Sequence, residues 1–217
     1  MLISFVTLAG LPGYGQDELN TITTGVPFLM ISPDARGGAM GDAGVASKPD
    51  GNSMYWNPAK FAFVEKPTGV SIGYSPWLRE LVDDIGLYNM TFFTRLDDIQ
   101  TVSASLRYFS LGEIQFTDNE GGDLGTYQPN EFAIDAAYSR KLSDNLSLAV
   151  AGRFIHSNLT LGQDAGSSQT RPGTSVAADV GMYYEDEVDV GASDGVFAFG
   201  VNISNIGAKI LFLQTLD

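Results

Sequence analysis

The sequence contains no cysteine, which excludes disulfide bonds, thiolate metal sites and a cysteine nucleophile. It also lacks an apolar run of the roughly 18 residues that a membrane-spanning helix requires, so a helical membrane protein is excluded. Basic residues are scarce: 12 lysines and arginines stand against 26 aspartates and glutamates, and the net charge is -14. A chain of this charge repels phosphate backbones, and nucleic acid is therefore not an expected partner.

The first sixteen residues, MLISFVTLAGLPGYGQ, combine an apolar core with a small-residue end. This pattern is typical of a secretory signal peptide with processing near Gly15 or Gln16, and it predicts export from the cytoplasm. The positively charged start of such a signal is missing, because the first basic residue is Arg36. The alternative is a short buried segment at the beginning of a soluble domain. Residues 1–16 are left out of the predicted fold.

From about residue 68 onward, large apolar residues alternate with small or polar ones. This alternation predicts about seven β-strands with no helix between them. The predicted strands are GVSIGYS (69–75), IGLYNMTFF (85–93), TVSASLRYF (101–109), EFAIDAAYSR (131–140), NLSLAVAGRF (145–154), TSVAADVGMYY (174–184) and VFAFGVNISN (196–205).

The two faces of these strands differ in chemistry. One face is small or ionisable and carries Arg107, Asp135, Arg153, Asp179 and Asn202, whereas the other repeatedly ends in an aromatic residue (Tyr74, Tyr108, Tyr138, Phe154, Tyr184). An apolar outer band with aromatic ends and a polar lumen predicts an antiparallel transmembrane β-barrel. The alternative is a soluble β-sandwich or a lipocalin-like barrel, in which the apolar face points inward.

The connections between the predicted strands alternate in length. LDDIQ (96–100) and RKLSDN (140–145) are short, whereas residues 110–130 and 156–173 form long excursions rich in glycine and in acidic or amide residues. Outer-membrane barrels have short periplasmic turns and long external loops. The acidic stretch YEDEVDVGASDG (184–195) is expected to be a loop longer than a periplasmic turn requires.

Residues 17–67 precede the first predicted strand and are rich in glycine and alanine in their first half. Small residues permit close backbone packing, and the Asn57-Pro58 pair favours a turn. The segment is predicted to be a hatch or plug inside the barrel, and the alternative is a surface arm that covers an edge strand. The expected organisation is a signal remnant (1–16), a hatch (17–67) and a truncated first half of a barrel (68–217).

The run ISPDARGGAMGDAGVASKPDGNSMYWNPAKFAF (31–63) resembles the amino-terminal signature of the PorV (LptO) family, an outer-membrane component of the type IX secretion system. Its NPA element (Asn57, Pro58, Ala59) is similar to one in the wider group of FadL-like barrels, to which PorV and PorQ belong. The resemblance implies a barrel of about fourteen strands, roughly half of them present here, with a lumenal amino-terminal segment. It also implies a shuttle that takes exported cargo from the translocon to a cell-surface attachment complex containing the sortase-like PorU.

The resemblance carries over a set of signature residues: Asp34, Arg36, Gly37, Gly41, Asp42, Gly44, Asn52, Tyr55, Trp56, Asn57 and Pro58. We expect Asp34, Arg36 and Asp42 to make buried polar or ionic contacts with residues of the lumen, since an unpaired buried charge is costly. Tyr55 and Trp56 are expected to anchor the hatch against the wall.

No motif in the sequence predicts catalysis or a cofactor. His156 is the only histidine, no serine sits in a G-x-S-x-G elbow, and the glycine-rich GGDLG and DARGGAMGD lack the context of a phosphate-binding loop. Two clusters of acidic residues are expected to be solvated loops. One contains Glu185, Asp186, Glu187 and Asp189, and the other contains Asp118, Glu120 and Asp123. Calcium binding by these clusters is left open. No catalytic residue, metal or cofactor is therefore predicted.

Three functions fit these observations. In the first, an outer-membrane protein uses its long external loops, residues 110–130 and 157–174, to bind the carboxy-terminal signal domain of secreted cargo proteins. The expected partners are that cargo, PorU, the translocon and outer-membrane lipid. The second is a FadL-type channel for hydrophobic small molecules, which predicts an apolar lumenal pocket. The third is a structural barrel without a transported ligand.

Overall fold

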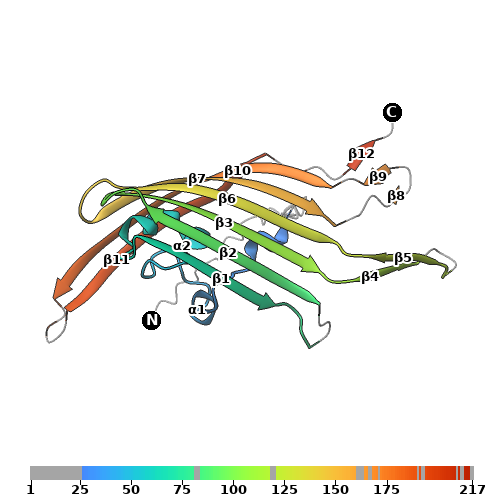
Figure 1. The fold of residues 1–217 in the computed structure, drawn as a ribbon, viewed down its shortest axis with the longest axis horizontal. Helices are drawn as coiled ribbons and strands as arrows, with labels where there is room; N and C mark the ends of the chain where they lie inside the picture. Colours follow the sequence, from blue (N-terminus) through green and yellow to red (C-terminus); the bar gives the residue numbers. More distant parts are fainter. Residues whose placement is uncertain are drawn as a thin grey trace, which may run out of the picture.

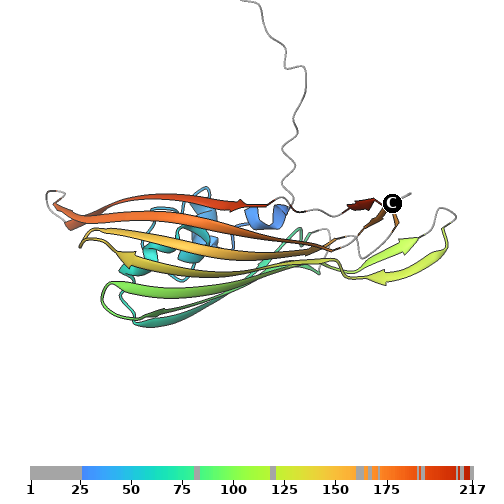
Figure 2. The same cartoon turned by 90° about the horizontal axis from the view of Figure 1, so that it is seen from above.

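The computed structural model describes residues 26–80, 84–117, 121–159, 164–165, 168–170, 172–189, 191, 194–208, 210 and 213–215. Seven long strands form one antiparallel sheet in the order β1-β2-β3-β6-β7-β10-β11. They are β1 (Thr68–Pro76), β2 (Ile85–Arg95), β3 (Gln100–Leu111), β6 (Asn130–Lys141), β7 (Leu146–Asn158), β10 (Gly173–Asp189) and β11 (Asp194–Gly207). The sheet curves into a half-barrel (Figures 1 and 2). The predicted strands and the all-β antiparallel class are confirmed.

The sheet exposes its apolar face and buries its polar one. Along β3, Ser103, Ser105 and Arg107 are buried, whereas Leu106 on the opposite face is exposed. On β1, Ile72 retains 78% of its accessible surface. This polarity is the opposite of that in a soluble sandwich or a lipocalin, and it is the polarity of a sheet whose outer face meets lipid.

Aromatic side chains line both ends of the exposed face. At the end with the long connections, the ring centroids of Tyr74 and Tyr88 are 4.9 Å apart, and those of Tyr88 and Tyr108 are 6.2 Å apart. His156 packs on Phe132 in the same row, with centroids 5.0 Å apart. Tyr184 and Phe197 form a pair near the opposite end. The lone histidine therefore belongs to an aromatic row.

Long and short connections lie at opposite ends of the sheet, as predicted (Figure 1). The excursion between β3 and β6 contains a hairpin that the sequence analysis missed, β4 (Ile114–Thr117) and β5 (Asp123–Tyr127). The excursion between β7 and β10 contains β8 (Asp164–Ala165) and β9 (Ser168–Thr170), and β9 also pairs with β12 (Leu213–Thr215). The long excursions are thus partly built of strands.

The acidic stretch 184–195 was wrongly expected to be a long loop. Glu185–Asp189 continue β10, and β11 begins at Asp194, so only residues 190–193 connect the two strands. Pairing continues through Asp186↔Phe197 and Val188↔Gly195, although β7 pairs with β10 only as far as Tyr184. The paired ends of β10 and β11 extend beyond β7 and are exposed, so charged residues can occupy strand positions there.

Residues 26–64, called the amino-terminal segment below, lie within the curve of the sheet (Figure 2). The segment contains η1 (Pro27–Met30), α1 (Ala35–Ala39), α2 (Ser53–Trp56) and η2 (Pro58–Phe63). A proline starts both 3-10 helices, since its fixed φ suits the first helical position and its missing N–H is not needed there. Among the described residues, no helix has the length and apolarity required to cross a bilayer.

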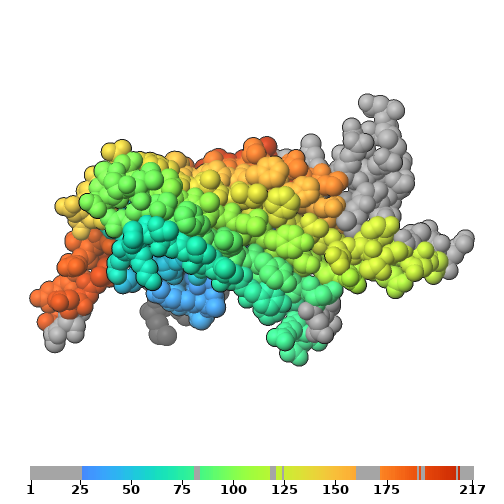
Figure 3. All heavy atoms as spheres, in the orientation of Figure 1, coloured from blue at the N-terminus to red at the C-terminus, as the bar shows by residue number. Residues whose placement is uncertain are grey.

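Apolar contacts join the segment to the sheet at two levels. Toward the long connections, Phe28 and Leu29 pack with Leu87, Phe109 and Ile155. Toward the short turns, the segment buries a second set (Met54, Phe61, Val64) against Phe93, Ala137 and Ala151. In the space-filling view the segment is visible only along the edge of β1, and the sheet covers the rest of it (Figure 3).

Candidate functional site

Asn57, whose side chain is fully buried, connects the segment to the wall by a hydrogen bond. Its Nδ2 donates to the carbonyl of Met182 on β10 (2.8 Å) and to that of Val45 (3.2 Å). Its Oδ1 accepts from the N–H of Ala59 (3.1 Å), which caps η2. One amide therefore fixes the start of a helix, the fold of the segment and its position on the sheet.

The two residues after Asn57 are held through their backbone. Ser139 on β6 donates from its hydroxyl to the carbonyl of Pro58, and Ser147 on β7 donates to that of Ala59, both at 2.7 Å. The NPA element thus contacts three adjacent strands. The small inward residues that the alternation predicted act here as hydrogen-bond donors to the segment.

Two glycines make this close approach sterically feasible. A Cβ at Gly181 would lie 2.4 Å from Oδ1 of Asn57, and a Cβ at Gly200 would lie 2.4 Å from the carbonyl oxygen of Val45. Contacts this short do not occur in folded proteins, so a side chain at either position would displace the segment. Gly181 and Gly200 therefore form the floor on which Asn57 and Val45 rest.

A ladder of buried charges crosses the middle of the concave face: Arg107 on β3, Asp135 on β6, Arg153 on β7 and Asp179 on β10. Asp135 accepts from Arg107 (3.4 Å), from the Nε of Arg153, and from Ser105 (2.8 Å). Arg153 also pairs with Asp179 at 2.9 Å. Charges of opposite sign alternate from strand to strand, so each of these four charges has a partner of opposite sign.

The ladder extends to β11 through a β-bulge. The pairing of β10 with β11 shifts register between Ala178 and Val180, and Asn205 adopts a left-handed φ of 60°. Asn205 donates its N–H to Asp179 (2.7 Å) and accepts from Arg153 through its side chain. Asparagine tolerates this conformation better than most residues do, so the bulge and the ladder stabilise each other.

Tyr55 connects the segment to this ladder. The guanidinium of Arg107 lies 5.4 Å from the centre of its ring, a cation–π contact, and its hydroxyl donates to the carbonyl of Met30. Burial raises the pKa of the Tyr55 phenol, and Arg107 partly opposes that shift. Trp56 packs instead inside the segment: Cβ atoms at Gly37 and Gly44 would lie 2.7 and 2.2 Å from its ring.

The charged signature residues lie within the segment or at its surface. Asp34 is buried and accepts from Trp56 (3.0 Å), from Asn52 (3.3 Å) and, as the cap of α1, from the N–H of Arg36. The side chain of Arg36 is exposed and pairs with Asp50 at 3.8 Å. Asp42 is exposed as well, after Gly41, and both have a positive φ. In place of the expected contacts with the lumen wall, Asp34 organises the segment itself.

Lys60 was not singled out from the sequence, yet it is fully buried. Its ammonium donates to the carbonyl of Gly44 (2.9 Å) and to the hydroxyl of Ser47 (3.0 Å). Burial lowers the pKa of Lys60 to about 8, and the attraction of Asp50 and Asp34 opposes that shift only in part. Lys60 ties the loop after α1 to η2, two residues beyond Pro58.

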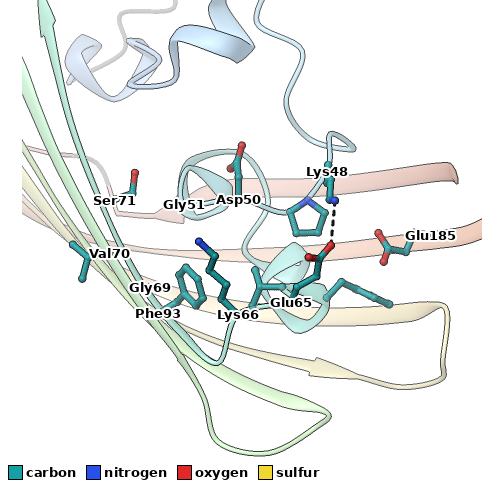
Figure 4. A pocket seen from close by; sticks show the side chains of 13 residues that line it. Lys48, Asp50, Gly51, Glu65, Lys66, Gly69, Val70, Ser71, Phe93 and Glu185 are labelled. Carbon is teal, nitrogen blue, oxygen red and sulfur yellow. Dashed lines mark hydrogen bonds and ion pairs between the residues drawn. The ribbon is translucent and has the colours of Figure 1, made fainter. Parts of the chain in front are cut away.

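Two cavities with mixed polar and apolar linings lie beside the segment. One, of about 410 Å³, lies between the segment and the ladder and includes Tyr55, Trp56, Arg107, Arg153 and Asn202. The other, of about 490 Å³, lies near the short turns. Figure 4 shows the Lys48–Glu65 ion pair beside that second cavity, with Glu185 facing it from β10.

Among the described residues, no group of three or more histidine, cysteine, aspartate or glutamate side chains is placed to hold a metal ion. Glu185, Asp186, Glu187 and Asp189 lie along one strand, and Asp186 accepts from Asn145. Asp118 and Glu120 lie outside the described residues, and Asp123 caps its own hairpin by accepting from the N–H of Gly125.

A comparison with protein families covers both the segment and the sheet. A family model described as type IX secretion system protein PorV matches residues 14–215. The chain belongs to the PorV family. No curated protein matches it in a sequence search.

Membership of the PorV family implies a role in type IX secretion. The family is one of secretion-system outer-membrane proteins and is not a known enzyme family. The resemblance that residues 31–63 carry is thereby confirmed, and the match extends over both the segment and the sheet.

Proposed function

We propose that this protein is an outer-membrane shuttle of type IX secretion, which binds the carboxy-terminal signal domain of exported proteins and delivers them to the PorU attachment complex. The observation that carries the proposal is the inverted polarity of the sheet, seen in a chain of the PorV family. An exposed apolar face with aromatic ends is suited to a bilayer, and a polar ladder is suited to a lumen.

The amino-terminal segment serves in this proposal as the hatch of a FadL-like barrel. The hydrogen bonds of Asn57, Ser139 and Ser147 support it, since they fix the segment to three strands of the concave face. A segment held in this way closes the lumen without blocking the outer ends of the strands. Recognition then falls to the long connections, which stand at the end of the sheet opposite the short turns (Figure 1).

The test is purification of the protein from its native outer membrane in mild detergent, followed by mass spectrometry of whatever co-purifies. The proposal predicts exported proteins that carry the terminal signal domain, together with PorU. A matched control expresses one such exported protein without its signal domain, which should then no longer be recovered. Recovery of the truncated protein at the same level would refute recognition through that domain.

A FadL-type channel for hydrophobic small molecules is supported by one feature. A cavity of about 200 Å³ lies between η1 and the outer ends of β7, β10 and β11 and is lined largely by apolar residues, including Val26, Leu29 and Ile155. The two larger cavities have mixed linings that include charged residues. Fatty acids that co-purify without any protein partner would favour the channel over the shuttle.

A further inference from the structure

The hairpin of β4 and β5 stands away from the main sheet at the long-connection end (Figures 1 and 3). Among the described residues, β4 pairs with β5 alone, through Ile114↔Tyr127, Gln115↔Thr126 and Phe116↔Gly125. A two-stranded ribbon is marginally stable by itself, and an unpaired strand edge is a template for another strand. The outer edge of β4 is therefore available for pairing.

The base of this hairpin is held in a fixed direction. Asp84, in the connection between β1 and β2, accepts from the N–H of Glu113 at 2.7 Å. Gln128 on the returning side donates to the carboxylate of Glu113 at 2.8 Å. Gly112 has a φ of 76°, and a Cβ there would lie 2.3 Å from the Asp84 carboxylate, so the contact requires glycine. These bonds aim the ribbon outward and prepare its edge for a partner.

The chemistry of the ribbon defines the partner. Ile114, Gln115 and Thr117 are exposed, and the rings of Phe116 and Tyr127 pack edge to face, with centroids 5.2 Å apart. Residues 112–129 contain four carboxylates, Glu113, Asp118, Glu120 and Asp123, and no lysine or arginine. A stretch of negative sign attracts a basic partner and repels a second copy of the same hairpin.

We propose that the outer edge of β4 accepts a β-strand of the exported protein's terminal signal domain, flanked by lysine or arginine side chains. This inference rests on the proposed function and specifies how the domain is held. Main-chain hydrogen bonds to β4 supply affinity that tolerates different cargo sequences, and the carboxylates of Glu113 and Asp123 at the ends of the hairpin strands favour positive charge. Such a site suits a shuttle, because one edge can serve many exported proteins.

The test uses photo-crosslinking of the whole protein in detergent with the purified signal domain of one exported protein. Because the chain lacks cysteine, Gln115→Cys and Glu80→Cys each supply a single attachment point for a benzophenone maleimide. Gln115 lies on β4, whereas Glu80 is an exposed residue of the β1–β2 connection. We expect crosslinking from position 115 to exceed that from position 80 by about fivefold, and to fall when salt rises from about 50 to about 500 mM.

Hydrogen exchange separates strand pairing from mere proximity. Binding of the domain should slow exchange of the outward amides of Ile114–Thr117, which a contact through side chains alone would leave unchanged. A domain that binds but crosslinks no better from position 115, or leaves the β4 amides unprotected, overturns this inference and leaves the proposed function standing. A domain that fails to bind the unmodified protein overturns both.

Discussion

At the scale of single residues, the Asn57 side chain makes three hydrogen bonds, whereas those of Tyr55 and Trp56 make one each. Its amide hydrogen-bonds to Met182, to Val45 and to Ala59, and the Asn57 side chain is fully buried. Trp56 makes its described contacts within the segment, with Asp34 and with the positions of Gly37 and Gly44. Polar contacts therefore fix the segment on the wall, and Trp56 gives the segment its internal shape.

Replacement Asn57→Ala should weaken docking of the segment by about 3 kcal/mol, because it removes a helix cap and two hydrogen bonds to backbone carbonyls. The measurement is a urea titration followed by Trp56 fluorescence in a Trp77→Phe background, where Trp56 is the single tryptophan. Asn52→Ala is the matched control. It removes one bond to Asp34 inside the segment and should cost about 1 kcal/mol. Equal losses for the two variants would contradict the role of Asn57.

Lys60 predicts a pH dependence of the same docking. Its pKa in the folded protein, about 8, lies below the ordinary 10.5, so the undocked lysine binds more protons between these values. Docking should therefore gain stability as pH rises from about 8 to about 10.5, by on the order of 3 kcal/mol in total. Lys60→Gln should abolish this gain in the Trp56 titration. Lys66→Gln, at an exposed lysine, should retain it; a flat profile in the unmodified protein would refute the assignment.

At the scale of elements, the sequence predicted the features that follow from strand periodicity. The seven strands follow from alternation, and so does the burial of Arg107, Asp135, Arg153 and Asp179 on one face. The hairpin of β4 and β5 was missed because glycine and polar residues mask a short alternation, and the β10–β11 ribbon was misjudged because its charges suggested a loop. Lys60, Ser139 and Ser147 could not be selected, since their role depends on contacts between residues more than 10 positions apart.

Substitution of alanine for glycine should have different effects at two glycines of the sheet, one of which contacts the segment. Gly200→Ala places a Cβ against the carbonyl oxygen of Val45 and should weaken docking by about 2 kcal/mol, because backbone cannot yield as a flexible side chain does. Gly152→Ala on β7 is the control, since a Cβ there meets no atom within 4 Å. The readout is access of iodide to Trp56 in the Trp77→Phe background. Unchanged access in Gly200→Ala would show that the segment does not rest on β11.

Substitution of Asp135, at the centre of the ladder, should strongly reduce the stability of the sheet. Asp135→Asn leaves two buried arginines, Arg107 and Arg153, without their shared carboxylate, and should destabilise the sheet by about 3–5 kcal/mol. The temperature at which the folded form is lost in a heat-modifiability gel measures this. Glu131→Gln on the same strand is the control, because Glu131 bonds Ser157 outside the ladder. A transition temperature for Asp135→Asn equal to that of the control would contradict a structural role for the ladder.

At the scale of the whole molecule, the sheet has its apolar face outward and its polar face inward, and this polarity determines what each face can contact. The apolar outer face is suited to lipid, the polar inner face accepts the segment through hydroxyls and amides, and the long connections are left at one end of the sheet. The sequence predicted this arrangement because strand period two separates the faces without knowledge of the fold. It could not predict how the segment sits, which depends on contacts from η2 and Asn57 to β6, β7 and β10.

A bimane probe at two neighbouring positions of β11 in outer-membrane vesicles tests most directly whether the apolar face of the sheet meets lipid. Val201→Cys lies on the exposed face, and Asn202→Cys lines the cavity beside the ladder. We expect brominated phospholipid to quench the probe at position 201 but not at 202, and aqueous iodide to quench the probe at 202 more strongly. The reverse pattern, or strong iodide quenching at both positions, would contradict a sheet that faces lipid with its apolar side.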